Sequence, residues 1–147
     1  MAAPEMICRL MQARTAAHMN HLKTTSFAEH KALDGFYSDL VDFIDSFAET
    51  YQGIFGLIKE YPTCPIPTGD AIVWIGDLRA WLKSDRADSC KGERELENIH
   101  DEIMAHFSST LYKMRFLDNP TTHEDDDESP SVEAAEDFMK MSKWTKT

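Results

Sequence analysis

The chain has 147 residues, of which 42% are hydrophobic and 28% are charged, so it can bury one core of ordinary size and a second independent domain is not expected. Its formal net charge of -11 excludes the broad attraction to phosphate backbones on which nucleic-acid binding usually depends. Its three cysteines, Cys8, Cys64 and Cys90, show no CxxC or metal-knuckle spacing, which indicates inert thiols in a reducing compartment rather than a disulfide framework.

Two helices are predicted in the first part of the chain. In the first, apolar residues and two inward-facing histidines, His18 and His21, recur at helical spacing over residues 4–22. Ser26 and Glu29 then fit a capping box, in which a hydroxyl and a carboxylate satisfy backbone donors at a helix start. The second helix therefore begins here, and its apolar stripe runs over residues 27–51 before the helix ends or bends near the next glycines.

Two more helices follow a proline-rich loop, "YPTCPIPTGD", whose prolines remove backbone donors and fix φ. Apolar spacing predicts a third helix over residues 70–83, a connector over residues 84–92 and a fourth helix over residues 93–117. Four helices joined by short or moderate loops are the pattern of an all-α four-helix bundle, which we place at residues 1–118.

The last part of the chain, residues 119–147, has a different composition. An acidic run at residues 124–128, flanked by Pro and Ser and without apolar periodicity, indicates an acidic linker. Residues 132–147 have the spacing of a short amphipathic helix. No stretch of the chain approaches the apolar length that spans a bilayer, so we expect no membrane contact and a cytoplasmic location.

Four potential metal ligands lie on one stripe of the second predicted helix. His30 and Asp34 are one turn apart, and so are Asp45 and Glu49. At about 100° per residue all four fall beside the apolar stripe, but eleven residues at about 1.5 Å rise separate the two pairs by roughly 16 Å. One helix cannot close a site around a single ion.

Two copies of this helix, packed antiparallel across a two-fold axis, would bring the pairs together. His30 and Asp34 of one chain would then meet Asp45 and Glu49 of the other, which gives two identical sites in a dimer. Imidazole combined with carboxylates suits iron, manganese or zinc, and the carboxylate majority favours iron or manganese. The alternative to metal binding is a solvent-exposed acidic face, which acidic helices commonly carry.

The segment "HLKTTSFAEHKALDGFYSDLVDFIDSFAE" resembles the ferroxidase segment of the Dps family, the ferritin-like DNA-binding proteins from starved cells. In that family a histidine ends the first helix, and the second helix carries His, Asp, Asp and Glu at the same offsets. Five residues match these positions: His21, His30, Asp34, Asp45 and Glu49. The loop after His21 is shorter than in that family, and Leu22 stands where Trp is common. The segments "SFAEHKALDGFY" and "STLYKMRFL" also resemble small Dps-like proteins of large tailed bacteriophages.

This resemblance implies a ferritin-like bundle that binds iron between subunits and oxidises Fe(II) with peroxide or oxygen. His30 and Asp34 would hold one ion, the partner's carboxylates would complete the site, and His21 would be a lateral ligand. It also implies a homo-oligomer, from a two-fold dimer up to a dodecamer, in the host cytoplasm or in a virion. Since the chain lacks the basic ends through which such proteins hold DNA, we expect no DNA binding.

The sequence leaves other readings open. A phage structural or host-interaction protein could keep the bundle without catalysis and bind a partner through its C-terminal tail. Glu97 and His100 have the ExxH spacing of internal di-iron sites, although only His100 should face inward. Trp74 and Trp81 are expected to be core or interface aromatics rather than platforms for nucleobases.

Overall fold

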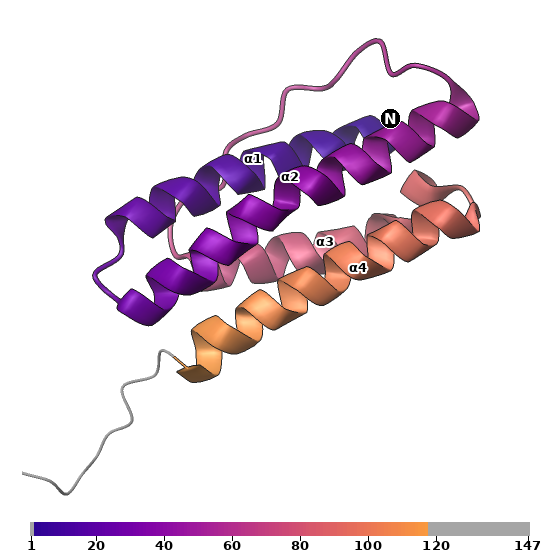
Figure 1. Cartoon of the computed structure of the whole chain (residues 1–147). Helices are drawn as coiled ribbons and strands as arrows, with labels where there is room; N and C mark the ends of the chain where they lie inside the picture. Colours follow the sequence, from indigo (N-terminus) through magenta and orange to yellow (C-terminus); the bar gives the residue numbers. More distant parts are fainter. Residues whose placement is uncertain (1, 118–147) are drawn as a thin grey trace, which may run out of the picture.

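The computed structural model describes residues 2–117, and within this range the chain is entirely helical with connecting loops (Figure 1). The elements are α1 (Ala2–Lys23), α2 (Phe27–Phe55), α3 (Ala71–Cys90), α4 (Arg94–Tyr112) and a closing π-helical turn, η1 (Lys113–Leu117). The predicted all-α bundle is confirmed over these residues. The predicted acidic linker and amphipathic segment, residues 119–147, lie outside the described range.

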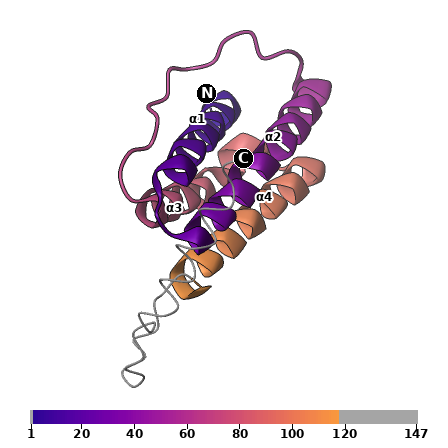
Figure 2. The ribbon, with the colours of Figure 1, turned by 60° about the vertical axis from the view of Figure 1, so that its left-hand side comes forward.

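One long connection sets the topology of the bundle. A tight turn makes α1 and α2 antiparallel neighbours, and another does the same for α3 and α4 (Figures 1 and 2). Between these hairpins, residues 56–70 cross the whole length of the bundle on the outer side of α1, so that α2 and α3 run in the same direction. We name this connection the strap. In the resulting square, α1 packs on α2 and α3, and α4 packs on the same two helices.

The core lies between all four helices. Three fully buried aromatic side chains, Phe36, Phe47 and Phe107, occupy it, and the rings of Phe36 and Phe107 meet edge to face at 5.0 Å. Buried aliphatic side chains from every helix surround them: Leu10, Leu40, Ile75, Leu82, Leu96 and Ile103. Burying one such side chain contributes about 1.5–3 kcal/mol. Isolated helices of this length are marginal in water, so this packing is the main source of helix stability.

Local capping explains where two helices begin. The Ser26 hydroxyl accepts a hydrogen bond from the Glu29 amide at 3.1 Å, which confirms the predicted start of α2. Thr24 Oγ1 joins the same network, since it donates to Glu29 Oε2 at 2.8 Å and accepts from the Ser26 amide. At α3, Asp70 Oδ1 accepts from the Ile72 amide at 3.0 Å. Both starts therefore follow from side chains that satisfy free backbone donors.

The predicted connector over residues 84–92 is wrong for most of its length, because α3 continues to Cys90. Contacts with other residues hold these polar turns in a helix. Arg86 pairs with Asp101 of α4 at 3.1 Å, the Ser89 hydroxyl bonds to Asp85, and Cys90 is fully buried. The fourth predicted helix is also altered near its end, where the α-helical ladder gives way to η1 after Tyr112.

Side-chain hydrogen bonds fasten the strap to α1 and α2. The Gln52 side chain accepts from the Ile58 amide at 3.0 Å, Cys8 Sγ donates to the Pro62 carbonyl at 3.1 Å, and Asn20 Nδ2 donates to the Gly69 carbonyl at 3.2 Å. The last two contacts lie near opposite ends of α1. The strap therefore follows α1 rather than looping into solvent.

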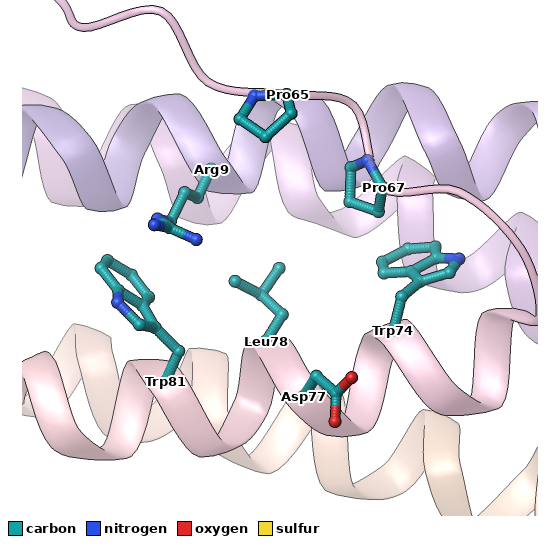
Figure 3. Close-up of a pocket in the computed structure, with 7 residues that line it drawn as sticks. All are labelled: Arg9, Pro65, Pro67, Trp74, Asp77, Leu78 and Trp81. Carbon is teal, nitrogen blue, oxygen red and sulfur yellow. The ribbon is translucent and has the colours of Figure 1, made fainter.

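A small cavity of about 210 Å³ remains between α1, α3 and the strap (Figure 3). Trp74 is buried and donates from Nε1 to Asn20 Oδ1 at 3.2 Å, whereas Trp81 is only half-buried and lies under the Arg9 guanidinium, 4.4 Å from its ring centroid. Pro65 and Pro67 of the strap form the opposite wall. Both tryptophans line the cavity, and the predicted core role holds for both, since Trp74 belongs to the core and Trp81 packs against it.

Candidate metal centre

Two of the five predicted ligands, His21 and His30, meet where α1 turns into α2, and Asp34 lies one turn farther along α2. His21 lies in the last turn of α1 and is buried, and His30 and Asp34 lie in the first turns of α2 and are half-buried. The short turn of residues 24–26, held by the Ser26 and Thr24 caps, places the two histidines against each other. Their imidazole rings stack with centroids 3.7 Å apart.

The two histidines also exchange hydrogen bonds with each other's backbone. Nδ1 of His21 lies 2.8 Å from the His30 carbonyl oxygen, and Nδ1 of His30 lies 2.9 Å from the His21 carbonyl oxygen. A carbonyl oxygen can only accept, so both Nδ1 atoms must carry the proton. In the neutral imidazoles the lone pair then lies on Nε2, which is the state in which a histidine binds a metal ion.

Two further residues extend this group. The exposed His18 ring stacks on Tyr37 at 4.3 Å, and the Tyr37 hydroxyl donates to Asp34 Oδ1 at 3.1 Å. Partial burial, and then the hydrogen bond to Asp34, raise the pKa of the Tyr37 hydroxyl, so it stays a donor. We name His18, His21, His30, Asp34 and Tyr37 the histidine cluster.

His18 and Tyr37 were not predicted as part of the site, although their spacing carries a signal. His18 precedes His21 by one turn, and Tyr37 follows Asp34 by one turn, so each lies beside a predicted ligand. The prediction that His18 faces inward is wrong. His18 is exposed and its ring packs on Tyr37 of α2, while the buried residues of the same half of α1 are Ala13, Ala16, Ala17 and His21.

The other two predicted ligands lie farther along α2. Asp45 and Glu49 are exposed, one turn apart, and the structure does not bring them to the histidine cluster of the same chain. Asp45 lines an open groove of about 320 Å³ between α1 and α2, whose other walls are Met11, Arg14, Val41, Ile44 and Thr15. Within residues 2–117 no three side chains of the His, Cys, Asp or Glu type are gathered closely enough to hold an ion.

The ExxH pair on α4 does not form an internal centre. His100 is fully buried and donates from Nε2 to the Leu82 carbonyl at 3.1 Å, while its Nδ1 has no partner. Burial lowers the pKa of His100, so the ring is neutral. Glu97 turns to the flank, with Oε1 3.5 Å from Arg86. As the spacing predicts, only the histidine faces the core.

Comparisons with known proteins assign the chain to a family. No solved structure matches the chain. The chain is 43% identical over 116 residues to the "Uncharacterized 14.6 kDa protein in mobD-ri intergenic region" of Enterobacteria phage T4, an alignment that covers 75% of this chain and 85% of that protein. Among residues 2–117, none of the helices combines the length and the apolar character needed to cross a bilayer.

The model of a protein family matches residues 21–114, a range that begins at His21 and includes all of α2, α3 and α4. The description of that family is "Family of unknown function (DUF5856)". Since the match covers more than half of the sequence, the chain belongs to the DUF5856 family.

Proposed function

We propose that this chain is a ferritin-like, Dps-like protein that binds iron between two subunits and oxidises Fe(II). The observation that carries the proposal is the reciprocal hydrogen bonding of His21 and His30 through Nδ1, which leaves Nε2 of each ring as the atom that can bind a metal ion. Asp34 supplies an oxygen ligand one turn from His30. The long strap between parallel α2 and α3 supports the proposal as well, because ferritin-like bundles have one such crossover.

The remaining ligands would come from a second copy of α2. The midpoint of positions 30 and 49 coincides with the midpoint of positions 34 and 45, between residues 39 and 40. A single two-fold axis at this point therefore pairs His30 with Glu49 and Asp34 with Asp45 of the partner at the same time. Ser38 and Val41 are related by the same axis and would meet at its centre.

The surface around this stripe has the character of a covered face. Leu22 is 71% exposed and Phe27 is 77% exposed beside the histidine cluster, and Met11 is 46% exposed at the groove. The mid-helix Gly35 costs helix stability, about 0.5–1 kcal/mol relative to Ala. A Cβ atom at Gly35 would meet no atom within 4 Å, so packing within the chain does not require a glycine there. Close approach of a partner subunit would account for the exposed apolar side chains and for the glycine at position 35.

The ligand set suits the proposed reaction. Two Fe(II) ions would each lose one electron to a peroxide molecule, or the electrons would pass to oxygen, while carboxylates stabilise the harder Fe(III) product. Iron is the substrate in this scheme. Manganese or zinc would occupy the same ligands without turnover.

Anaerobic addition of Fe(II) followed by peroxide tests the proposal. The wild type should oxidise Fe(II) faster than buffer, measured by ferric absorbance, and Asp45→Asn should lose that acceleration. Asp39→Asn is the matched control, since Asp39 is exposed on the same helix but away from the stripe. Equal rates for wild type and Asp45→Asn would contradict the proposal.

The second candidate function is that of a phage structural or host-interaction protein. Two observations favour it: the relative in phage T4 and the exposed apolar side chains at one end of the bundle. Near the end of α2 the exposed large apolar side chains are Ile54, Phe55, Leu57 and Tyr61. Such a protein would tolerate His30→Ala and would lose its partner when residues 132–147 are removed. A ferroxidase would show the opposite pattern.

A further inference from the structure

Two of the cysteines lie together although they are far apart in the sequence. Cys8 is on α1 and Cys64 is on the strap, and both side chains are buried, at 7% and 8% exposure. Cys8 Sγ donates to the carbonyl of Pro62, two residues before Cys64, at 3.1 Å. Cys64 of the strap is therefore close to the point at which the strap passes the Cys8 thiol.

The Cys8 thiol lies near enough to Cys64 to affect its pKa. Burial is the largest cause that raises the pKa of Cys64, to about 11, and the side-chain hydrogen bond with Cys8 and the charge of Cys8 are the next causes. Cys90 is different, because it is fully buried at the end of α3 and neither of the other thiols is among the causes that raise its pKa. The cysteines therefore divide into one pair and one isolated thiol.

We propose that Cys8 and Cys64 form a dithiol that peroxide converts into a disulfide, which fastens the strap to α1. One thiolate attacks an oxygen of hydrogen peroxide, the O–O bond breaks, and a sulfenic acid and hydroxide are formed. The second thiol attacks the sulfenic sulfur, the S–S bond forms and a second hydroxide leaves. The two protons of the thiols convert both hydroxides to water, so the dithiol is oxidised by two electrons and the peroxide is reduced.

The disulfide would restrain the strap over the Arg9 and tryptophan cavity. Pro65 immediately follows Cys64 and forms a wall of that cavity with Pro67 (Figure 3). A bond between residues 8 and 64 closes a long loop of chain, and cross-links of this kind stabilise chiefly by restricting the unfolded state. This proposal departs from the expectation that all three thiols are inert, and it does not rest on the proposed ferroxidase activity.

Oxidation of the full chain, with a chelator present to exclude iron, tests the inference. After incubation with hydrogen peroxide, free thiols should fall from three to one, and peptide mapping under non-reducing conditions should join the peptides of Cys8 and Cys64. The urea midpoint of the oxidised protein should rise, and dithiothreitol should reverse both changes. Because the high pKa of Cys64 limits its thiolate at neutral pH, the reaction should accelerate as the pH rises.

Cys90→Ser is the matched control and should still lose both remaining thiols, whereas Cys64→Ser should form no intramolecular disulfide. The wild-type measurement stands by itself if a variant fails to fold. Three free thiols after treatment, a bond that joins two chains, or oxidation of Cys90 in preference to the pair would overturn the inference.

Discussion

His21 and His30 have a structural role that is compatible with the proposed metal binding. Each imidazole satisfies the other residue's carbonyl, and the His21 carbonyl is one of the acceptors that the end of α1 leaves without a helical partner. The same bonds orient the rings and fix the proton on Nδ1. Structural and metal-binding roles are therefore compatible here.

His100 is fully buried in the core, and this position predicts a pH dependence of stability. Its pKa in the folded chain is lowered by burial, so the folded state takes up a proton less readily than the unfolded state. Stability should be full above the unfolded value, about 6.5, and should fall as the pH drops from there toward the lowered folded pKa. His100→Gln keeps a donor for the Leu82 carbonyl and removes this titration.

Urea unfolding at about pH 7.5 and about pH 5 measures the effect. The wild type should lose more free energy of unfolding between the two conditions than His100→Gln does. His106→Gln is a suitable control, because His106 is half-buried and also bonds to a backbone carbonyl, that of Phe36. An equal loss in wild type and His100→Gln would show that another group carries the pH dependence.

At the scale of helices, sequence reasoning succeeds where the determinants are local. The N-cap residues Ser26 and Asp70 are adjacent in sequence to the helices that they begin, so these helix starts were predictable from the sequence. The extension of α3 to Cys90 was not, because it depends on the pairing of Arg86 with α4. The path of the strap likewise depends on contacts with α1 that are distant in sequence.

The same distinction applies to the candidate site. The residue types and the spacing of the ligands on α2 were readable from the sequence. The stacking of His21 on His30 was not, since it depends on the geometry of the turn between two helices. The exposure of His18 was missed because the buried face of the second half of α1 is formed mainly by the small residues Ala13, Ala16 and Ala17, whereas an amphipathic pattern is easiest to recognise from large apolar residues.

The N-terminal cap of α3 gives a testable prediction about the stability that a helix cap contributes. Asp70→Ala removes the acceptor for the Ile72 amide and should lower the free energy of unfolding by about 1 kcal/mol. Asp77→Ala is the control, because Asp77 is exposed within the same helix and should change stability by less than about 0.5 kcal/mol. Chemical denaturation would measure both, and a cost for Asp77→Ala as large as that for Asp70→Ala would show that the cap is not the cause.

For the whole molecule, the proposed site requires at least a two-fold dimer. We expect light scattering at micromolar concentration to give a dimer or a larger assembly. Val41 lies beside the proposed axis, so Val41→Lys should place two like charges together and shift the protein toward monomers. Ala105→Lys, at an exposed position on α4, should leave the assembly unchanged. A wild-type monomer would remove the intersubunit site.

The charge of the whole chain predicts no binding to duplex DNA. The net charge is -11, and an acidic run precedes the last three lysines, Lys140, Lys143 and Lys146. Repulsion from phosphates should dominate, so a gel shift at about 0.15 M salt should show no complex. A complex at low micromolar protein would contradict this expectation, and the three lysines would be the first residues to replace.

In the proposed dimer each metal site draws ligands from two chains, and a mixing experiment tests this arrangement. His30→Ala and Asp45→Ala should each abolish tight Fe(II) binding in anaerobic calorimetry. When the two variants are unfolded together and refolded as a mixture, a mixed dimer has one site with both substitutions and one site with neither, so binding should return at one site per mixed dimer. Unchanged binding by either variant alone, or no recovery on mixing despite verified mixed dimers, would contradict the account.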